Sequence, residues 1–223
     1  MLAFAIGSFL ASRQASREGI NPSAVFDLVF LVFVSGVVGA RLFFVVMNLQ
    51  YYLNSPLEII MFQHGGLAWF GGLILGSVAA VLYLRIKRLP FYRTLDLLVP
   101  YVALAQAIGR VGCLLNGCCY GKESVFGFYF PLHQAVLMPT QLYSSLALIV
   151  IYVVLRIMQD HRHKAGQILC AYLGLYSAKR FIMEFFRADN PAVYHGLTLF
   201  QVLSAATFLF SLVFFIILNT RKK

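Results

Sequence analysis

The chain alternates between long apolar runs and short polar stretches. An apolar helix of about 20 residues crosses the ~30 Å of hydrocarbon in a bilayer, so each long run is a candidate membrane span. The pattern predicts seven spans, of which the first is short for a crossing. They cover approximately residues 3–12, 24–47, 66–84, 95–115, 139–158, 167–187 and 196–218. We therefore expect an all-α polytopic transmembrane helical bundle of about seven helices, folded as one integral-membrane domain over residues 1–223.

Composition agrees with this fold class, because 61% of the residues are hydrophobic and only 12% are charged. The positions of Lys and Arg indicate an orientation, since both are enriched on cytoplasmic loops. Most of them fall on alternate connections and at the C-terminus. They are Arg13, Arg17, Arg85, Lys87, Arg88, Arg93, Arg156, Arg162, Lys164, Arg221, Lys222 and Lys223. The connections between these hold only Lys122, so we expect the N-terminus outside and the C-terminus in the cytoplasm.

The formal net charge of +10 is thereby explained by topology. A nucleic-acid-binding module concentrates its charge on one exposed face, whereas here the charge is spread over several membrane edges. The expected partner is the lipid bilayer, and no nucleic acid is expected.

A smaller set of charged residues lies inside or at the ends of the apolar runs. Its members are Arg41, Arg110, Arg180, Arg187 and Glu184. An ionised side chain there costs several kcal/mol unless it is paired or solvated. The orientation above and a rise of ~1.5 Å per residue place all of them toward the outer face. Because the planar fork of arginine takes two phosphate oxygens at once, we expect a buried site for an anionic lipid head group.

Several of these charged residues lie close together in the run over residues 167–187. Tyr176, Arg180, Glu184 and Arg187 follow each other at steps of four, four and three, which stacks them along one stripe of a helix over 167–187. An internal ion-pair ladder that fixes helix packing is the alternative reading. The arginines outnumber the one acid, however, and an excess of cations in a low-dielectric layer requires an anion or water.

A glycine-rich segment over 109–121 leaves the fourth run at its outer end. It reads Gly-Arg-Val-Gly-Cys-Leu-Leu-Asn-Gly-Cys-Cys-Tyr-Gly and resembles the signature of the bacterial prolipoprotein diacylglyceryl transferases. The matching residues are Gly109, Arg110, Gly112, Asn116, Gly117 and Gly121. The resemblance continues, in chain order, through Gly39-Ala40-Arg41, the doublets Gly65-Gly66 and Gly71-Gly72, Pro139-x-Gln141-Leu142-Tyr143, and the Tyr176 to Arg187 stripe.

The resemblance implies a seven-helix bacterial inner-membrane fold with the N-terminus outside and the active site toward the outer, periplasmic side. It implies transfer of the diacylglyceryl group of phosphatidylglycerol to the lipobox cysteine of a prolipoprotein signal peptide, with release of glycerol phosphate. Arg110 and Arg180 would bind the phosphate, Tyr176 would bond the head group, and Glu184 would hold Arg180. The phospholipid-binding set is completed by Arg187, Arg41, Asn116, Gly117, Gly121, Gly71, Gly72 and Tyr143. No metal or soluble cofactor is expected.

Four positions depart from the family pattern. Phe70 and Met138 stand where the family has histidines, Ser144 stands where it has an acid, and Cys113 stands where it has an asparagine. The base that would deprotonate the acceptor thiol is therefore absent from its usual place, and the candidates to replace it are His64 and Glu184.

Two other functions stay open. A divergent relative would use the same phospholipid site with a different acceptor. A transporter or channel would use the intramembrane arginines to bind a translocated anion. The second alternative requires a pathway open to both faces, and the cytoplasmic halves of these runs carry few polar residues.

Cysteines and small residues complete the predictions. Cys113, Cys118 and Cys119 cluster at the outer edge, where an oxidising compartment permits a disulfide from Cys113 to Cys118 or Cys119, and free thiols are the alternative. Without nearby histidine ligands they are poor candidates for zinc. The patterns Gly72-xxx-Gly76 and Ser35-xxx-Gly39 predict close helix packing.

Overall fold

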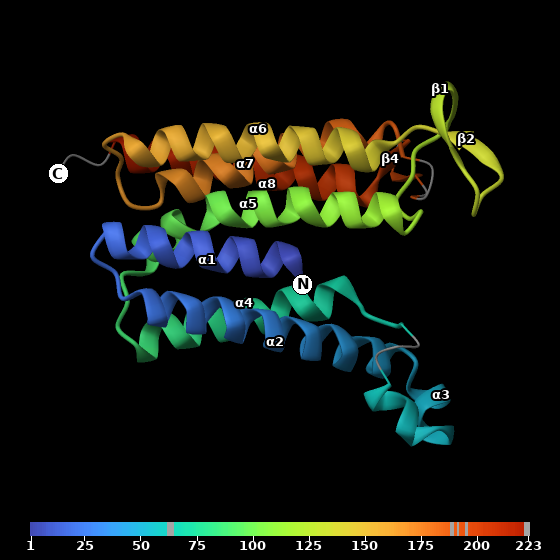
Figure 1. Cartoon of the computed structure of the whole chain (residues 1–223), viewed down its shortest axis with the longest axis horizontal. Coiled ribbons are helices and arrows are strands. Elements are labelled where there is room, and N and C mark those ends of the chain that lie inside the picture. Colours follow the sequence, from blue (N-terminus) through green and yellow to red (C-terminus); the bar gives the residue numbers. More distant parts are fainter. Residues whose placement is uncertain (62–64, 188–189, 191, 195, 221–223) are drawn as a thin grey trace. The chain divides into compact units, whose positions relative to one another are not determined.

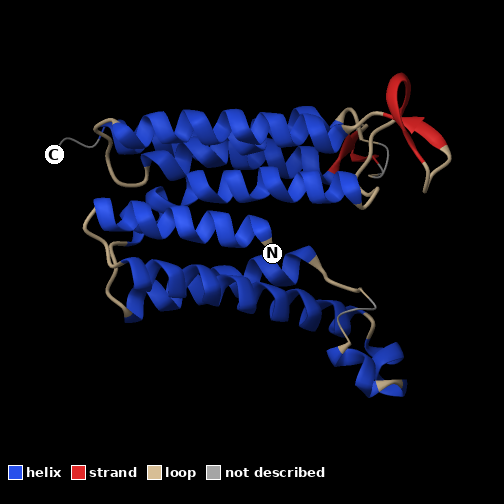
Figure 2. Ribbon diagram, viewed as in Figure 1, coloured by secondary structure: helices blue, strands red, loops and turns tan. Residues whose placement is uncertain are grey.

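The computed structural model describes residues 1–61, 65–187, 190, 192–194 and 196–220. Helices dominate it (Figures 1 and 2). They are α1 (Leu2–Arg17), α2 (Pro22–Met47), α3 (Leu49–Asn54), the 3-10 helix η1 (Pro56–Ile60), α4 (Trp69–Ile86), α5 (Phe91–Leu115), α6 (Thr140–Asp160), α7 (Gln167–Glu184) and α8 (Leu199–Thr220). The strands are β1 (Glu123–Phe130), β2 (Ala135–Leu137), β3 (Ala192–Tyr194) and β4 (Leu197–Thr198).

Five described helices are long and apolar enough to cross a membrane: α2, α4, α5, α6 and α8. This confirms a helical membrane protein. Each predicted span coincides with a helix, but α1 and α7 fall outside these five. The first has 16 residues, and the second carries Lys179, Arg180 and Glu184 within its 18 residues. The charged residues that make α7 a candidate site thus also interrupt its apolar run, and α7 is not among the five helices.

Contacts divide the chain into two compact units, one of residues 12–94 and one of residues 1–11 and 95–223. In the first unit α2 and α4 lie against each other. A Cβ on Gly39 would come within 2.5 Å of the Gly71 carbonyl, and one on Gly72 within 2.9 Å of the Gly36 carbonyl. The predicted close packing at these glycines is confirmed, because only their lack of a side chain lets the two backbones approach. That residues 1–223 fold as one domain stays a prediction.

In the second unit α5, α6 and α7 share an apolar core, and α8 packs on α7 (Figure 1). α5 contributes small residues at steps of four, and α6 contributes branched ones at steps of three and four, so each helix presents one face to its neighbours. The buried core residues are Val99, Ala103, Ala107, Leu148, Ile151, Leu155, Ile168 and Tyr172. This packing fixes the face of α7 that is left for polar residues.

One end of this unit is closed by polar contacts. The Asp96 carboxylate accepts the backbone N–H groups of Gly166 at 2.5 Å and Leu169 at 2.8 Å, and so caps the start of α7 from α5. Lys164 Nζ donates to the last carbonyls of α8, those of Leu218 and Asn219, at 3.0 and 2.9 Å. A cation at a helix C-terminus and an anion at an N-terminus both suit the helix dipole.

Asp96→Ala is expected to lower the free energy of unfolding by about 2–3 kcal/mol. Two charge-assisted hydrogen bonds are lost, and the first N–H groups of α7 are left without acceptors in a buried place. Thermal unfolding of the purified protein in detergent measures the change. Asp160→Ala is the matched control, because the Asp160 carboxylate is exposed and its ion pair with Arg156 spans 3.4 Å. Equal losses in the two variants would contradict the capping role.

The opposite end of the unit carries short strands. β1 and β2 form an antiparallel hairpin, and β3 pairs with β4. Gly121 forms a β-bridge with Arg187, and Lys122 N–H donates to the Phe186 carbonyl at 2.9 Å. The segment that follows α5 is therefore joined through its backbone to the end of α7.

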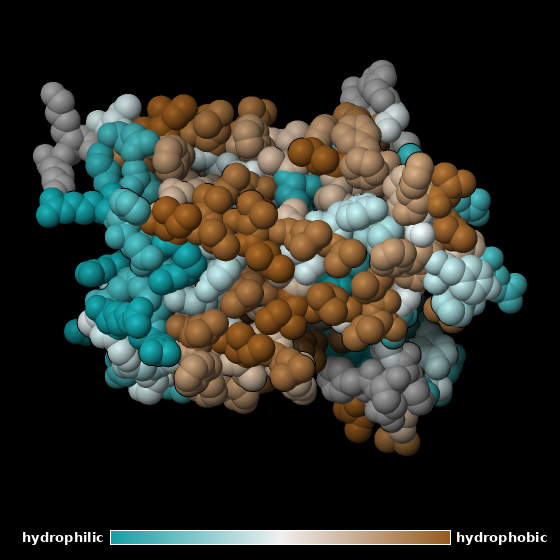
Figure 3. Space-filling model, turned by 45° about the horizontal axis from the view of Figure 1, so that its top comes forward, coloured by the Kyte–Doolittle hydropathy of each residue, from teal (hydrophilic) through white to brown (hydrophobic). Residues whose placement is uncertain are grey.

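On the face shown in Figure 3, apolar side chains cover much of the surface. Exposed examples lie on several of the predicted spans: Phe30, Leu73, Val150 and Phe210 have 52%, 50%, 62% and 64% of their surface accessible. A soluble protein does not expose so much contiguous apolar surface, so these faces fit a hydrocarbon surrounding.

Candidate functional site

Helix α7 carries Tyr176, Arg180 and Glu184 of the predicted stripe, with Lys179 on a neighbouring row. The prediction that Arg187 continues the stripe on the same helix is wrong, because α7 ends at Glu184 and Arg187 forms a β-bridge with Gly121 beyond that end. Arg180 Nη2 lies 3.1 Å from Glu184 Oε2, an ion pair one helical turn apart. The guanidinium of Arg180 also stacks on the Phe200 ring at 4.5 Å. Lys179 Nζ lies 4.7 Å from the centre of the Tyr176 ring, and Lys179 is only 8% exposed.

The carboxylate of Glu184 is held from three sides. Besides the Arg180 pair, Oε1 accepts hydrogen bonds from Asn190 Nδ2 at 2.6 Å and from Thr198 Oγ1 at 2.9 Å. The side chain is buried. A buried carboxylate with these partners is well suited to hold Arg180 in one orientation.

Four basic side chains lie within electrostatic reach of one another at this end of the unit and form a cationic cluster: Arg110, Lys179, Arg180 and Arg187. The charges of Arg110, Arg180 and Arg187 all act on Lys179, and those of Arg110 and Arg187 act on Arg180. The three predicted arginines of this unit are therefore brought together, as their depth along the helices predicts. Among the residues that the structure describes, Glu184 is the one acid paired within this group.

Lys179 is the residue that the sequence reading missed. It directly precedes Arg180 in an apolar run, so the cost of burying its charge was a signal available from the sequence. Lys179 was not included in the predicted stripe, because it lies three residues after Tyr176, on a neighbouring row of the helix.

The signature segment is fastened to the start of α6. Thr140 Oγ1 donates to the Cys119 carbonyl at 2.8 Å, and Gln141 Nε2 donates to the Cys118 carbonyl at 2.7 Å. His133 Nε2 lies 2.9 Å from the Gly117 carbonyl. These contacts give the segment after α5 a defined backbone course beside Arg110.

The thiol of Cys119 has a perturbed pKa. Burial alone would raise this pKa, but the nearby charge of Arg187, a hydrogen bond from Arg187 and the charge of Arg110 together lower it below its ordinary value. A negative charge beside the cationic cluster is therefore stabilised. This is the behaviour expected of a site that attracts anions.

Gly121 permits the backbone pairing that ends the signature. A Cβ there would come within 2.7 Å of the Phe186 carbonyl oxygen and of Thr140 Cγ2. We expect Gly121→Ala to cost about 1–3 kcal/mol of stability, because the segment that carries Phe186 and Arg187 must move to relieve the clash. Thermal unfolding in detergent measures this cost.

Gly112→Ala serves as the control for that variant, since a Cβ at Gly112 meets nothing within 4 Å. It is expected to leave stability unchanged or to raise it by about 0.5–1 kcal/mol, because alanine favours the helix. A Gly121→Ala protein as stable as this control would show that the close approach is unimportant.

A cavity of about 800 Å³ adjoins the signature segment. Most of its walls are apolar. They are formed by Leu114, Leu115, Asn116, Gly117, Phe128, Tyr129, Phe130, Pro131 and Leu132. Asn116 and Gly117, both predicted to bind phospholipid, thus line a space between the end of α5 and the β1–β2 hairpin. Tyr143, from the same predicted set, is 41% exposed on the first turn of α6.

Arg41, in the other unit, is buried in a cage of backbone carbonyls. Its Nε donates to Ile59 at 3.0 Å, Nη1 donates to Gly65 and to Gly66 at 3.0 Å, and Nη2 donates to Glu58 and to Met61 at 3.2 Å. Arg41 is 3% exposed. Its five N–H groups are thus engaged by the chain itself.

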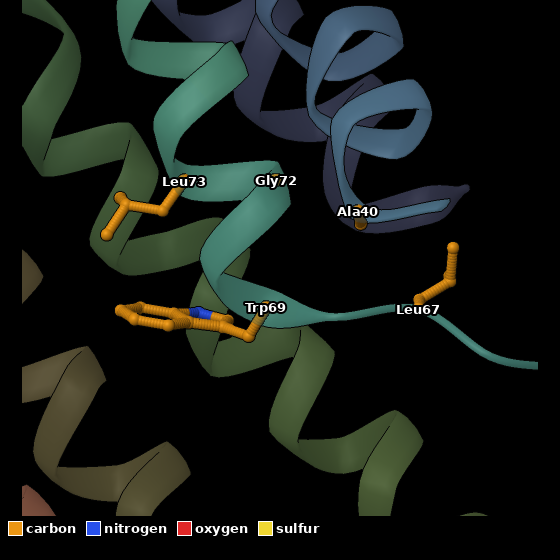
Figure 4. Close-up of a pocket in the computed structure, with 5 residues that line it drawn as sticks. All are labelled: Ala40, Leu67, Trp69, Gly72 and Leu73. Atoms are coloured by element: carbon orange, nitrogen blue, oxygen red, sulfur yellow. The ribbon is translucent and has the colours of Figure 1, made fainter. Parts of the chain in front are cut away.

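The predicted residues Gly71 and Gly72 lie where α4 crosses α2. Gly72 also lines an apolar cavity of about 390 Å³ with Ala40, Leu67, Trp69 and Leu73 (Figure 4). Figure 4 places the Trp69 and Leu73 side chains on one side of Gly72, and Ala40 and Leu67 on the other. His64, the predicted base, lies outside the described residues.

Comparison with known proteins gives the family. The family model described as prolipoprotein diacylglyceryl transferase matches residues 1–217. A phosphatidylglycerol–prolipoprotein diacylglyceryl transferase of Enterococcus faecalis is 33% identical over 227 residues, which cover 96% of this chain and 82% of the relative. Relatives of the same name from Clostridium kluyveri and Streptococcus pyogenes are 34% and 33% identical, covering 96% and 93% of this chain and 88% and 84% of the relatives.

The chain belongs to the prolipoprotein diacylglyceryl transferase family. The resemblance seen in the sequence is thereby confirmed. Phe70, which stands at a histidine position of the family pattern, is 43% exposed beside Gly71. Met138, at the second such position, pairs its backbone with Gly121 and Lys122. Neither side chain can take a proton from an acceptor thiol.

Proposed function

We propose that this member of the family transfers the diacylglyceryl group of phosphatidylglycerol to the lipobox cysteine of prolipoproteins and releases glycerol phosphate. The observation that carries the proposal is the meeting of Arg110, Lys179, Arg180 and Arg187 with one paired carboxylate, Glu184. Such an excess of positive charge at low dielectric fits an anionic head group.

The transfer requires that a thiolate sulfur attack the glyceryl carbon bonded to phosphate oxygen. Negative charge then grows on the departing phosphate as the carbon–oxygen bond breaks. Fixed cations stabilise that charge more than they stabilise the bound lipid, which is the condition for lowering the barrier. Arg110 and Arg180 are assigned to the phosphate, and Tyr176 to the head group.

Two assignments differ from those drawn from the sequence alone. Lys179 joins the phosphate-binding cations, because it is buried among them. Arg41 is assigned to holding residues 58–61 and 65–66 in place, because five backbone contacts engage its guanidinium. Glu184 is assigned to positioning Arg180, and Arg187, Asn116, Gly117 and Gly121 to shaping the lipid site.

The protein is proposed to lie in the bacterial cytoplasmic membrane with the cationic cluster toward the outer side. Support comes from the second unit, where Lys164 and the end of α8 meet at one end and the cations of α7 lie near its other end. The positive-inside rule assigns the first end to the cytoplasm.

The test incubates the purified protein with radiolabelled phosphatidylglycerol and a lipobox peptide. Thioether-linked peptide and glycerol phosphate are expected in equal amounts. A peptide with serine in place of the lipobox cysteine, and phosphatidylethanolamine in place of phosphatidylglycerol, are the controls, and neither is expected to give product.

The same assay separates the alternatives. Release of glycerol phosphate without modified peptide would indicate a divergent relative with another acceptor. Flux of a labelled anion through proteoliposomes, with no lipid turnover, would indicate a transporter. Either result would overturn the proposed reaction.

A further inference from the structure

Three thiols meet beside the cationic cluster. The Sγ atoms of Cys113, Cys118 and Cys119 all lie within 4.8 Å of one another, and each residue is half-buried. All three are free. These cysteines were expected to be poor candidates for zinc, because no histidine lies near them along the chain. The fold nevertheless brings three sulfur ligands together.

The positions of these thiols are fixed by the backbone. Cys119 has a φ of 63°, in the left-handed region that residues with a side chain rarely adopt. The carbonyls of Cys118 and Cys119 are held by Gln141 and Thr140, as described above, and Cys118 N–H donates to the Cys113 carbonyl at 3.1 Å. A strained residue held by its neighbours commonly marks a functional position.

The spacing of the sulfurs suits a single metal ion. Zinc–thiolate bonds are about 2.3 Å long, so three sulfurs around one ion lie about 3.8–4.0 Å apart. Small rotations of the Cys side chains bring sulfurs within 4.8 Å to that separation. Thiolates select soft or borderline d¹⁰ ions, and three protein ligands leave the fourth tetrahedral position open, as in catalytic zinc sites.

Positive charge beside Cys119 favours the thiolate form of this ligand, the form that binds a metal ion. Three thiolates and one divalent cation carry a net charge of −1. The guanidinium of Arg187 hydrogen-bonds Cys119, and its charge and that of Arg110 lower the pKa of the Cys119 thiol. Arg110 is assigned to the lipid phosphate and Arg187 to shaping the lipid site, so the sulfur cluster lies next to the place where the transferred carbon must sit.

We propose that Cys113, Cys118 and Cys119 bind one thiophilic d¹⁰ cation of the Zn²⁺ type, whose open fourth position takes the acceptor thiol. The inference rests on the proposed function. It supplies what the chain otherwise lacks at Phe70 and Met138, namely a means of deprotonating the acceptor.

The step balances without a further reactant. The acceptor thiol displaces water from the ion and gives its proton to solvent, because a thiol bound to such a cation is deprotonated. The bound thiolate then attacks the glyceryl carbon. The carbon–sulfur bond forms, the carbon–oxygen bond breaks, and glycerol phosphate leaves with the electron pair. The ion acts by generating the nucleophile at neutral pH.

Metal binding is tested first, without reference to activity. The reduced, metal-free full chain in detergent is titrated with Cd²⁺, and the sulfur-to-metal absorbance in the ultraviolet is followed. One ion per chain is expected. Cys113→Ser, Cys118→Ser and Cys119→Ser are each expected to weaken binding by about 100-fold or more, since loss of even an outer-shell partner of a metal site costs about 10- to 100-fold. Cys170→Ser is the control, because Cys170 lies within α7, outside the cluster, and is expected to bind as the wild type does.

Binding that is absent, or that is the same in the Cys113, Cys118 and Cys119 variants as in the Cys170 control, overturns the site. A disulfide among the three cysteines that persists in the active protein overturns it as well. Thermal unfolding of each metal-free variant separates loss of a ligand from loss of the fold.

Activity is then measured on the metal-free and the Zn²⁺-loaded protein with the lipobox peptide. Loading is expected to restore transfer at least about tenfold, and a chelator to reverse the gain. Equal transfer by both forms overturns the role of the ion in thiol activation while leaving the transferase assignment intact. No transfer by either form, with Cd²⁺ still bound by the three thiols, overturns the proposed function instead.

Discussion

Replacing Arg110 or Arg180 by alanine is expected to lower diacylglyceryl transfer about 10²–10³-fold, the loss that follows removal of one preorganised charge-stabilising donor. Each side chain is assigned to the departing phosphate, where negative charge develops during the reaction. Initial rates with phosphatidylglycerol and the lipobox peptide measure the effect. Because the lost interaction is stronger in the transition state than with bound lipid, the decrease should appear in kcat more than in KM.

Arg156→Ala is the matched control for both variants. Arg156 also pairs with an acid four residues later, Asp160, at 3.4 Å, but it lies at the end of α6 away from the cluster. Its rate is expected to stay within about twofold of wild type, since exposed ion pairs contribute little. Transfer that survives undiminished in Arg110→Ala and Arg180→Ala proteins would remove the cationic cluster from the mechanism.

Arg41→Met is expected to lower the free energy of unfolding by about 3–5 kcal/mol, because several backbone carbonyls of residues 58–61 and 65–66 lose a buried, charged donor at once. Methionine keeps an apolar stem of similar length but donates no hydrogen bond. For a chain of this size the loss corresponds to a fall in Tm of about 6–20 °C. Thermal unfolding in detergent measures it.

Arg85→Ala provides the comparison for Arg41→Met. Arg85 is exposed in the last turn of α4, and its removal is expected to change stability by no more than about 0.5 kcal/mol. If Arg41→Met were as stable as Arg85→Ala but deficient in transfer, the carbonyl cage would be incidental. Arg41 would then return to the phospholipid-binding set in which the sequence placed it.

Much of the helical framework is predictable from hydropathy, because a span must satisfy every backbone group within itself and so has a characteristic length. α2, α5, α6 and α8 appear close to the predicted ranges. The β1–β2 hairpin was not predicted from the sequence. Such a hairpin depends on pairing across a turn, which the hydropathy of the chain does not reveal.

The candidate site was predictable wherever a charged residue lies in an apolar run, because burying a charge costs free energy. Arg110, Arg180, Glu184 and Arg187 stood out for that reason, and the structure brings them together. Lys179 carried the same signal and was overlooked. Arg41 stood out equally, yet the sequence does not reveal that its acceptors are the carbonyls of a segment 17 to 25 residues away.

The sequence by itself determined that this is a helical membrane protein of the prolipoprotein diacylglyceryl transferase family, because apolar length and the signature motifs are local properties of the chain. Tertiary structure decided which buried cations are already satisfied and which gather around one carboxylate. It also decided that Cys113, Cys118 and Cys119 form a cluster within 4.8 Å. Hydrogen-bond partners and thiol spacing depend on how separate segments fold against one another, and no pattern along the chain encodes those distances.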